Sequence, residues 1–218
     1  MKLRLTKVVI FFAALIPLAR LGWKALHGDL GANPIEVITH STGDWTLRLV
    51  LVTLTITPLR RITKQYWLIG IRRMIGLFAF FYGSLHFTTY IWLDKFFDLH
   101  EMFKDVAKRP FITVGFSAFV LLIPLVLTST AGWIRRLGGK NWQRLHRLIY
   151  LTGILGVIHY LWLVKADLRK PLEYGFALSV LLLYRVVMWA AEKRKNAAVA
   201  ARPRASAEVT EAQASPLR

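Results

Sequence analysis

Two histidines in apolar segments are the residues of this chain best suited to bind a metal ion. His86 lies in the run YGSLHFTTYIW and His159 in the run LGVIHYLWLV. Neutral imidazole is a common iron ligand that apolar surroundings tolerate, and an ionisable residue inside an apolar span usually marks a functional site. One such histidine alone could simply hydrogen-bond a neighbouring helix. The presence of two favours a shared site.

The two histidines are expected at the same depth in their helices. His86 comes 12 residues after Met74, where its apolar segment begins, and His159 comes 11 residues after Leu148. At a rise of about 1.5 Å per residue, both lie roughly 16–18 Å along their helices. Two imidazoles at equal depth on different helices could take the two axial positions of one haem, whose apolar rim suits the interior of a helical bundle.

A second group of candidate residues lies nearer to the start of the same two helices. His146 precedes His159 by 13 residues, and Arg73, next to Arg72, precedes His86 by the same number. Arginine is a poor iron ligand, but it binds phosphate, propionate or a quinone-like oxygen well. Arg72 and Arg73 could also be ordinary flanking charges of a span. Thirteen steps along one ideal helix leave two side chains about 140° apart, so we expect a break or bulge near His146.

Membrane-spanning helices must position these residues. The chain has 218 residues, of which 55% are hydrophobic, and its mean hydropathy is +0.43. We predict an all-α fold, a polytopic membrane helical bundle with six transmembrane helices within residues 1–192, followed by a disordered cytoplasmic tail at 193–218. The six expected spans are 8–26, 45–59, 74–93, 111–133, 148–164 and 173–191.

Charge placement sets the expected orientation. The chain carries 30 Lys and Arg against 12 Asp and Glu, a net charge of +18. Nineteen of the positive residues fall on the N-terminus, the tail and every second connection, and seven fall on the other connections. This asymmetry predicts that both termini are cytoplasmic, and it explains the basic composition without a nucleic-acid partner. Because the chain has no cysteine, disulfides, iron–sulfur clusters and covalently attached c-type haem are excluded.

Several other polar residues receive structural interpretations. We expect His27, His40 and His100 to be solvated residues of outer connections. Arg20 and Arg48 lie toward the outer ends of the first two spans, where snorkelling to the headgroups is the favoured interpretation over pairing with haem propionates. The stretch 62–71 is expected to lie in the inner membrane interface.

Two sequence runs on this framework resemble a known family. The runs 72–86 (RRMIGLFAFFYGSLH) and 141–167 (NWQRLHRLIYLTGILGVIHYLWLVKAD) are similar to the MsrQ family, the haem-binding membrane subunits of periplasmic protein-methionine-sulfoxide reductases, which have a ferric-reductase-like transmembrane domain. The resemblance covers residues 1–192. It implies a b-type cytochrome of the bacterial inner membrane that takes electrons from the quinone pool or from FMN. It also implies a periplasmic molybdopterin subunit as the partner that reduces methionine sulfoxide.

The resemblance also implies roles for individual residues. His86 and His159 would be axial ligands of the principal haem b, and His146 would be a further ligand. Arg72 and Arg73 would lie at the flavin or quinol side, and Arg73 stands where larger ferric reductases carry a fourth histidine. Catalysis is expected in the partner. Two alternatives stay open, namely a quinol-linked cytochrome b that reduces another acceptor such as ferric chelates, and a proton or anion transporter lined by His and Arg.

Overall fold

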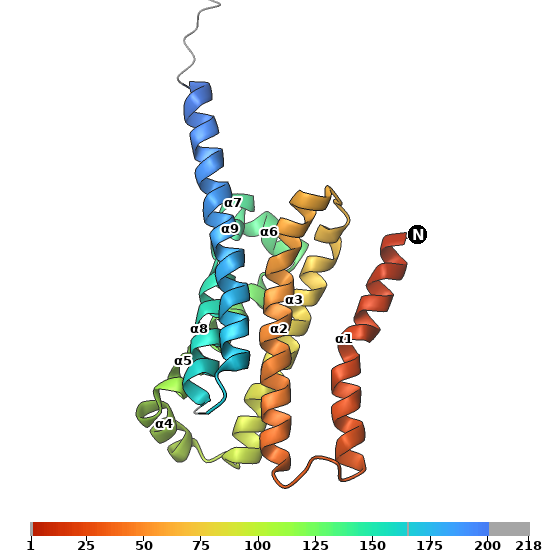
Figure 1. Cartoon of the computed structure of the whole chain (residues 1–218), viewed down its shortest axis with the longest axis vertical. Coiled ribbons are helices and arrows are strands. Elements are labelled where there is room, and N and C mark those ends of the chain that lie inside the picture. The colour runs from red at the N-terminus through yellow and green to blue at the C-terminus, as the bar shows by residue number, and fades with distance from the viewer. Residues whose placement is uncertain (1, 165, 201–218) are drawn as a thin grey trace, which may run out of the picture. The chain divides into compact units, whose positions relative to one another are not determined.

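Every regular element in the described part of the chain is a helix (Figure 1). The computed structural model describes residues 2–164 and 166–200. The helices are α1 (Lys2–Leu26), α2 (Pro34–Thr63), α3 (Leu68–Thr88), η1 (Thr89–Asp94), α4 (Leu99–Lys108), α5 (Pro110–Leu127), α6 (Ala131–Leu137), α7 (Gly139–Leu145), α8 (Leu148–Leu163) and α9 (Arg169–Ala200). The all-α prediction is therefore confirmed over these residues. The chain forms one compact unit up to Leu181 and a second from Leu182 onward.

Four helical segments of the described chain are long and apolar enough to cross a membrane. They are Leu3–Leu26, Leu68–Asp94, Pro110–Leu127 and Arg169–Val199. The other two expected spans, 45–59 and 148–164, lie within α2 and largely within α8. Both segments are helical, but they are not both long enough and apolar enough to be counted with these four. Helix α8 has 16 residues, and α2 carries charged side chains through its first half.

Helix α2 begins earlier than the hydropathy predicted, and the reason is local. Asn33 caps the helix by accepting a hydrogen bond from the Glu36 amide at 3.3 Å, and Pro34 occupies the first helical position, where a missing N–H costs nothing. The stretch 34–44, expected as part of an outer connection, is therefore helical. This extension places His40 and Asp44 on α2, next to the candidate site.

Other boundaries differ from the expected ones. The expected span 111–133 is divided, because α5 ends at Leu127 and a new helix, α6, starts after Thr130, whose hydroxyl caps the Trp133 amide. The stretch 62–71, expected in the inner membrane interface, contains the end of α2 at Thr63 and the start of α3 at Leu68. The expected tail at 193–218 is helical as far as Ala200, and its remainder lies outside the described residues.

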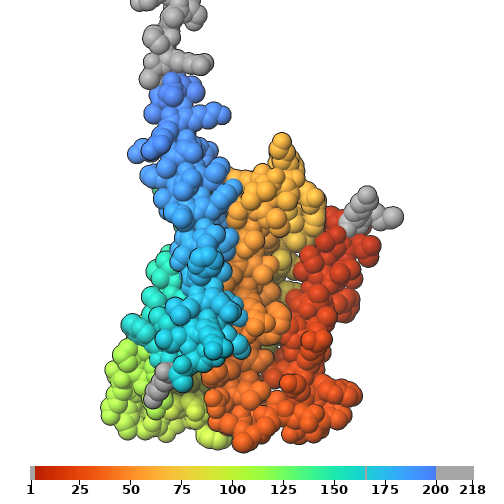
Figure 2. All heavy atoms as spheres, viewed as in Figure 1, coloured from red at the N-terminus to blue at the C-terminus, as the bar shows by residue number. Residues whose placement is uncertain are grey.

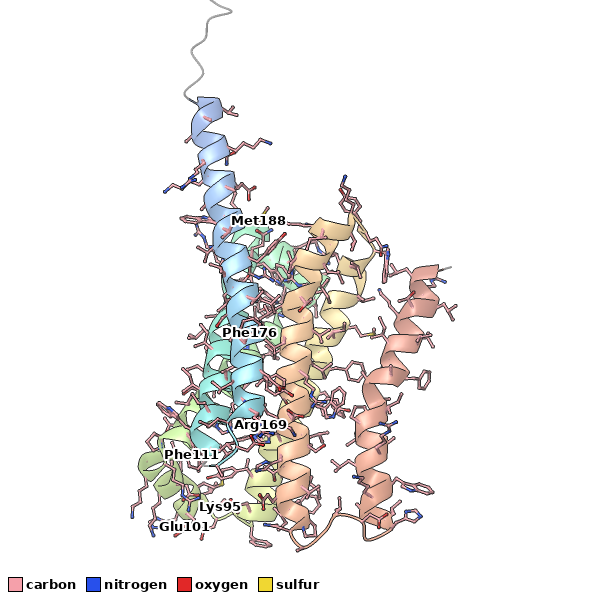
Figure 3. All side chains as sticks on the ribbon, in the orientation of Figure 1. Lys95, Glu101, Phe111, Arg169, Phe176 and Met188 are labelled. Atoms are coloured by element: carbon pink, nitrogen blue, oxygen red, sulfur yellow. The ribbon has the colours of Figure 1, made fainter. Side chains whose placement is uncertain are left out.

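The connection after α3 is largely helical, although it was expected to be a loop. Helix α3 continues as the π-helical segment η1, and α4 follows. Lys95 Nζ lies 2.6 Å from Asp105 Oδ2, and both side chains are largely buried, so this ion pair ties the end of η1 to α4. The hydrogen bond with Asp105 raises the pKa of Lys95 above 10.5. Lys95 and Phe111 lie at the same end of the bundle as α4 (Figure 3).

Helix α1 is joined to α3 through one tyrosine. The side chain of Tyr82 is almost fully buried, and its hydroxyl donates to the Ala14 carbonyl at 2.7 Å while accepting from the Leu18 amide at 3.2 Å. These two backbone groups flank Pro17, which cannot continue the normal helical hydrogen bonding. The Tyr82 hydroxyl therefore supplies hydrogen bonds to the backbone of α1 at the place where Pro17 interrupts the helix. The seam between α1 and α2 is hollowed in the space-filling view (Figure 2).

Candidate functional site

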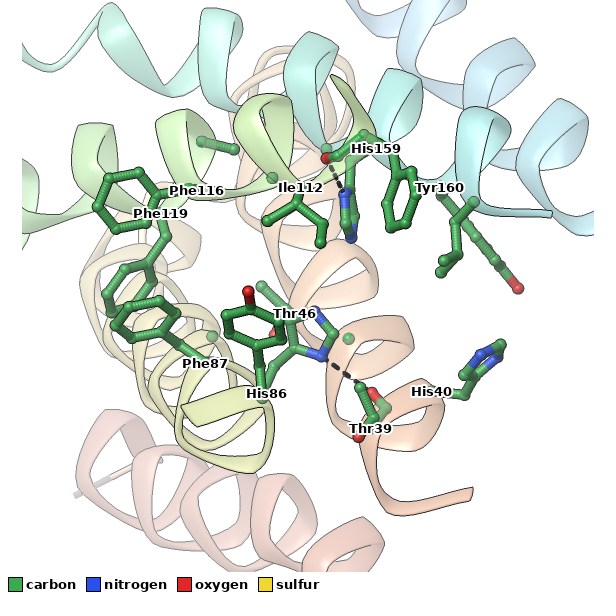
Figure 4. Close-up of a pocket in the computed structure, with 18 of the residues that line it drawn as sticks. Thr39, His40, Thr46, His86, Phe87, Ile112, Phe116, Phe119, His159 and Tyr160 are labelled. Atoms are coloured by element: carbon green, nitrogen blue, oxygen red, sulfur yellow. Dashed lines mark hydrogen bonds between the residues drawn. The ribbon is translucent and has the colours of Figure 1, made fainter. Parts of the chain in front are cut away.

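A large cavity lies among α2, α3, α5 and α8, and residues of α4 line one end of it. Its volume is about 820 Å³, and most of the side chains around it are apolar or aromatic (Figure 4). Phe87 and Phe119 stack with 4.8 Å between their ring centres. Cavities of 300 to 1,000 Å³ with such a lining are typical of cofactor and small-molecule sites. The cavity therefore has room for a bulky, largely apolar molecule.

His86 on α3 and His159 on α8 both line this cavity and face one another (Figure 4). Their ring centres are 6.1 Å apart, and the ring planes make an angle of 74°. The structure thus brings together the two histidines that the depth argument paired. Among the described residues, no group of three or more His, Cys, Asp or Glu side chains is arranged to hold a metal ion.

One backbone carbonyl fixes the protonation of each imidazole. His86 Nδ1 lies 2.9 Å from the Thr39 carbonyl oxygen, and His159 Nδ1 lies 2.7 Å from that of Phe111. A carbonyl can only accept a hydrogen bond, so each Nδ1 must carry the proton and donate it. Each Nε2 then keeps its lone pair, which is the form of histidine that binds a metal ion.

Two glycines allow these hydrogen bonds to form. A Cβ atom on Gly43 would lie 3.0 Å from Cε1 of His86, and one on Gly115 would lie 2.5 Å from Nδ1 of His159. Gly43 follows Thr39 by one helical turn on α2, and Gly115 follows Phe111 by one turn on α5. The same arrangement therefore occurs twice. A carbonyl holds the imidazole of the neighbouring helix, and a glycine one turn later leaves space for the ring.

His146 lies apart from this pair, in the break between α7 and α8. Its ring stacks on Trp142 with 3.8 Å between ring centres, and its Nδ1 lies 3.1 Å from the Trp142 carbonyl oxygen. Nε2 of His146 is buried near the backbone of Leu125 and makes no hydrogen bond of regular geometry to the described residues. Burial lowers the pKa of His146, and the charge of Arg72 lowers it further. The expected break is present, since α7 ends at Leu145 and α8 begins at Leu148.

The two neighbouring arginines differ in their surroundings. Arg72 is half-buried on α3 and close enough to His146 to influence its charge, and its Nη1 lies 3.4 Å from the Thr57 hydroxyl. Arg73 is exposed. The structure thus groups Arg72, and not Arg73, with His146.

Several polar residues in and near the first half of α2 differ from their expected surroundings. Arg48, expected to snorkel, binds Asp44 at 2.7 Å, and its Nε donates to the Tyr174 hydroxyl at 2.8 Å. The Tyr174 hydroxyl in turn donates to Asp44. His40, expected to be solvated in an outer connection, is exposed as expected, but it lies on helix α2 and at the edge of the cavity. Asp44, His40 and Tyr160 also line a second cavity of about 600 Å³, together with the exposed Arg20.

Known proteins are similar in sequence to most of this chain. Residues 42–157 match the family model described as ferric reductase like transmembrane component. A protein of Herminiimonas arsenicoxydans named protein-methionine-sulfoxide reductase heme-binding subunit MsrQ is 59% identical over 202 residues, which are 91% of this chain and 92% of that protein. Proteins of the same name from Ralstonia nicotianae and Xanthomonas campestris are 50% and 48% identical, over 91% and 92% of this chain and 92% and 94% of theirs. The chain belongs to the MsrQ family.

The match to the MsrQ family confirms the resemblance seen in the two sequence runs. The part that matches the ferric-reductase-like model contains His86, His146 and both glycines, and it ends two residues before His159. Sequence reasoning found the histidines of this family member and missed Gly43 and Gly115. The feature that could have indicated them is one glycine on each of α2 and α5, the helices that neighbour α3 and α8.

Proposed function

We propose that this chain is the b-type cytochrome subunit of a protein-methionine-sulfoxide reductase, with haem held by His86 and His159. The observation that carries the proposal is the distance between the two rings. Two imidazoles that bind one ion at about 2 Å each have ring centres about 6 Å apart, and these rings are 6.1 Å apart. The relatives' names state heme binding, which supports the same assignment.

The histidines, the volume and the lining of the cavity all fit a haem. The two Nδ1–H···O=C bonds from His86 and His159 leave both Nε2 atoms available, so these atoms could bind the haem iron. The volume of about 820 Å³ and the aromatic lining suit a flat apolar macrocycle. When bound, haem b supplies a one-electron couple between ferric and ferrous iron.

The chain's own residues then perform defined tasks. The carbonyls of Thr39 and Phe111 orient the imidazoles and increase their basicity, which favours the oxidised metal. Phe87, Phe116 and Phe119 exclude water, and a dry surrounding is one of the means by which a protein sets a redox potential. This chain positions an electron carrier, and the reduction of methionine sulfoxide takes place in the partner.

The region around His146 is the proposed entry side for electrons. The buried Nε2 of His146, which makes no regular hydrogen bond, suits a further haem ligand, and the nearby Arg72 suits the phosphate of FMN or the oxygen of a quinol. Arg73, being exposed, suits contact with a donor at the inner surface. Electrons would pass from the quinone pool or FMN at this side to the periplasmic molybdopterin-containing partner at the other.

The arrangement in the membrane completes the proposal. We propose six spans in the bacterial inner membrane, with α2 and α8 crossing in addition to the four more apolar segments, and with both termini cytoplasmic. The concentration of positive charge on alternate connections supports this orientation. The haem-binding domain would comprise residues 1–192, and 193–218 would form a cytoplasmic tail.

Visible spectroscopy of the purified full-length protein in detergent tests the proposal. The reduced-minus-oxidised spectrum is expected to show a low-spin haem with two histidine ligands. His86→Ala and His159→Ala are each expected to lose this signal, because either substitution would remove one of the two proposed iron ligands. His27→Ala is the matched control, since His27 is exposed and stacks on Trp23. A wild-type protein without haem, or full haem content in both variants, would refute the assignment.

The family description favours one alternative acceptor. A ferric-reductase-like domain could pass its electrons to ferric chelates instead of a molybdopterin subunit. The reduced cytochrome, mixed either with ferric citrate or with a purified periplasmic molybdoenzyme, separates the two. Rapid reoxidation by the molybdoenzyme alone is expected, and rapid reoxidation by ferric citrate alone would establish the alternative.

A further inference from the structure

One buried hydroxyl in the main cavity has no partner. Tyr90 lies in the π-helical segment η1, four residues after His86, and its side chain lines the cavity. Its hydroxyl oxygen is buried and makes no hydrogen bond to any described residue. Burying an unpaired hydroxyl is unfavourable, so such a group usually serves a ligand or a bound water. Short π-helical segments occur frequently at functional sites.

A cation lines the same end of the cavity. Arg109 lies between α4 and α5, and Tyr90 is within electrostatic range of the ion pair of Asp105 and Lys95, of Asp94 and, more weakly, of Arg109. Arg109 Nε lies 3.5 Å from Asp105 Oδ1, which is long for an ion pair, whereas Lys95 Nζ lies 2.6 Å from Asp105 Oδ2. The negative charge of Asp105 is thus balanced mainly by Lys95. A guanidinium has five N–H donors, so Arg109 retains donors for an anion.

The acidic residues around this end do not prevent an anion from binding. Asp44 is paired with Arg48 at 2.7 Å, and Asp94 lies 3.9 Å from Lys95. Glu36 accepts a hydrogen bond from the Asn33 side chain and lies 4.0 Å from His40. Each of these carboxylates therefore has a positive or hydrogen-bonding neighbour of its own.

We propose that Tyr90 and Arg109 bind a carboxylate of the molecule in the main cavity, and that this carboxylate is a haem propionate. The inference rests on the proposed function, because it takes haem as the occupant. The macrocycle would lie between His86 and His159 among the phenylalanines. Its propionates would point toward the end lined by α4, where Tyr90 donates one hydrogen bond and Arg109 supplies the opposite charge.

The test compares haem with its dimethyl ester, which has the same macrocycle and uncharged ester groups. The full-length protein is produced without haem, purified in detergent and titrated with each compound by absorbance. The wild type is expected to bind haem about tenfold or more tightly than the ester, as charge-assisted hydrogen bonds imply. Tyr90→Phe and Arg109→Gln are each expected to reduce this preference several-fold while leaving the affinity for the ester unchanged.

Two control variants match the substitutions. Tyr66→Phe and Lys108→Gln alter exposed side chains that do not line the cavity, and both should keep the wild-type preference. Equal wild-type affinities for haem and ester would overturn the inference and leave haem binding intact. Variants that weaken both compounds equally would also overturn it, since they would show a structural role only. A wild type that binds neither compound would refute the proposed function, and this inference with it.

Discussion

The substitution Gly115→Ala tests whether the close approach of α5 orients His159. The added Cβ would lie 2.5 Å from Nδ1 and 2.7 Å from Cε1 of the imidazole. Non-bonded heavy atoms are normally about 3.5 Å apart, so the ring would have to move by about 1 Å. The hydrogen bond from Nδ1 to the Phe111 carbonyl, now 2.7 Å long, could not survive that displacement.

The expected magnitude follows from the role of this hydrogen bond. Removing a group that orients a metal-bound histidine typically lowers metal affinity by about 10- to 100-fold. We expect a loss of haem affinity in that range for Gly115→Ala. Gly43→Ala should have a smaller effect, because its Cβ would lie 3.0 Å from the His86 ring, a distance that a slight adjustment relieves.

Titration of the haem-free protein with haem measures this effect. Gly22→Ala is the matched control, because nothing lies within 4 Å of its added Cβ. Alanine favours a helix over glycine by about 1 kcal/mol, so weaker haem binding by Gly115→Ala could not be explained by a weaker helix. Wild-type affinity and an unchanged spectrum in Gly115→Ala would refute the reasoning.

Two further predictions concern polar contacts around the cavity. Tyr174→Phe removes the hydroxyl that joins Asp44 and Arg48 and is expected to cost about 2 kcal/mol, measured as a melting temperature several degrees lower, whereas Tyr66→Phe should melt like the wild type. Asp105→Asn leaves Lys95 without its carboxylate partner, and losing one member of a buried pair costs about 3–5 kcal/mol, so amide exchange in 99–108 should accelerate by 100-fold or more. Because the pKa of Lys95 is raised above 10.5, the stabilisation from this pair is complete below pH 10.5 and is lost only as the pH rises through the folded-state pKa. Wild-type protection of 99–108, corrected for intrinsic exchange, should therefore stay constant from pH 7 to 10, and a decline in that range would contradict the assignment.

The histidine pair could be predicted from sequence because helical rise converts residue number into depth. Counting from Met74 and Leu148 placed His86 and His159 at one level, and the structure brings them together. The break near His146 could also be predicted, because an uninterrupted helix would point His146 and His159 in different directions. Both inferences use only the local geometry of a helix.

The features that could not be predicted depend on which helices become neighbours. Arg48 and Tyr174 are 126 residues apart in sequence, and nothing in either segment identifies the other as its partner. Gly43 and Gly115 are significant only because an imidazole of another helix occupies the space beside them. Helix α4 was missed because its charged residues resemble those of a loop, although the apolar positions 99, 102, 103 and 106 have helical spacing.

Helix α8, which carries His159, has consequences for the lipid around it. Its 16 residues span about 24 Å at 1.5 Å per residue, whereas the hydrocarbon layer of a typical bilayer is about 30 Å thick. In the proposed six-span arrangement, acyl chains beside α8 must shorten or disorder to match it, at a cost that grows with each ångström of mismatch. The protein should therefore be more stable in bilayers of short-chain lipids than in thick ones.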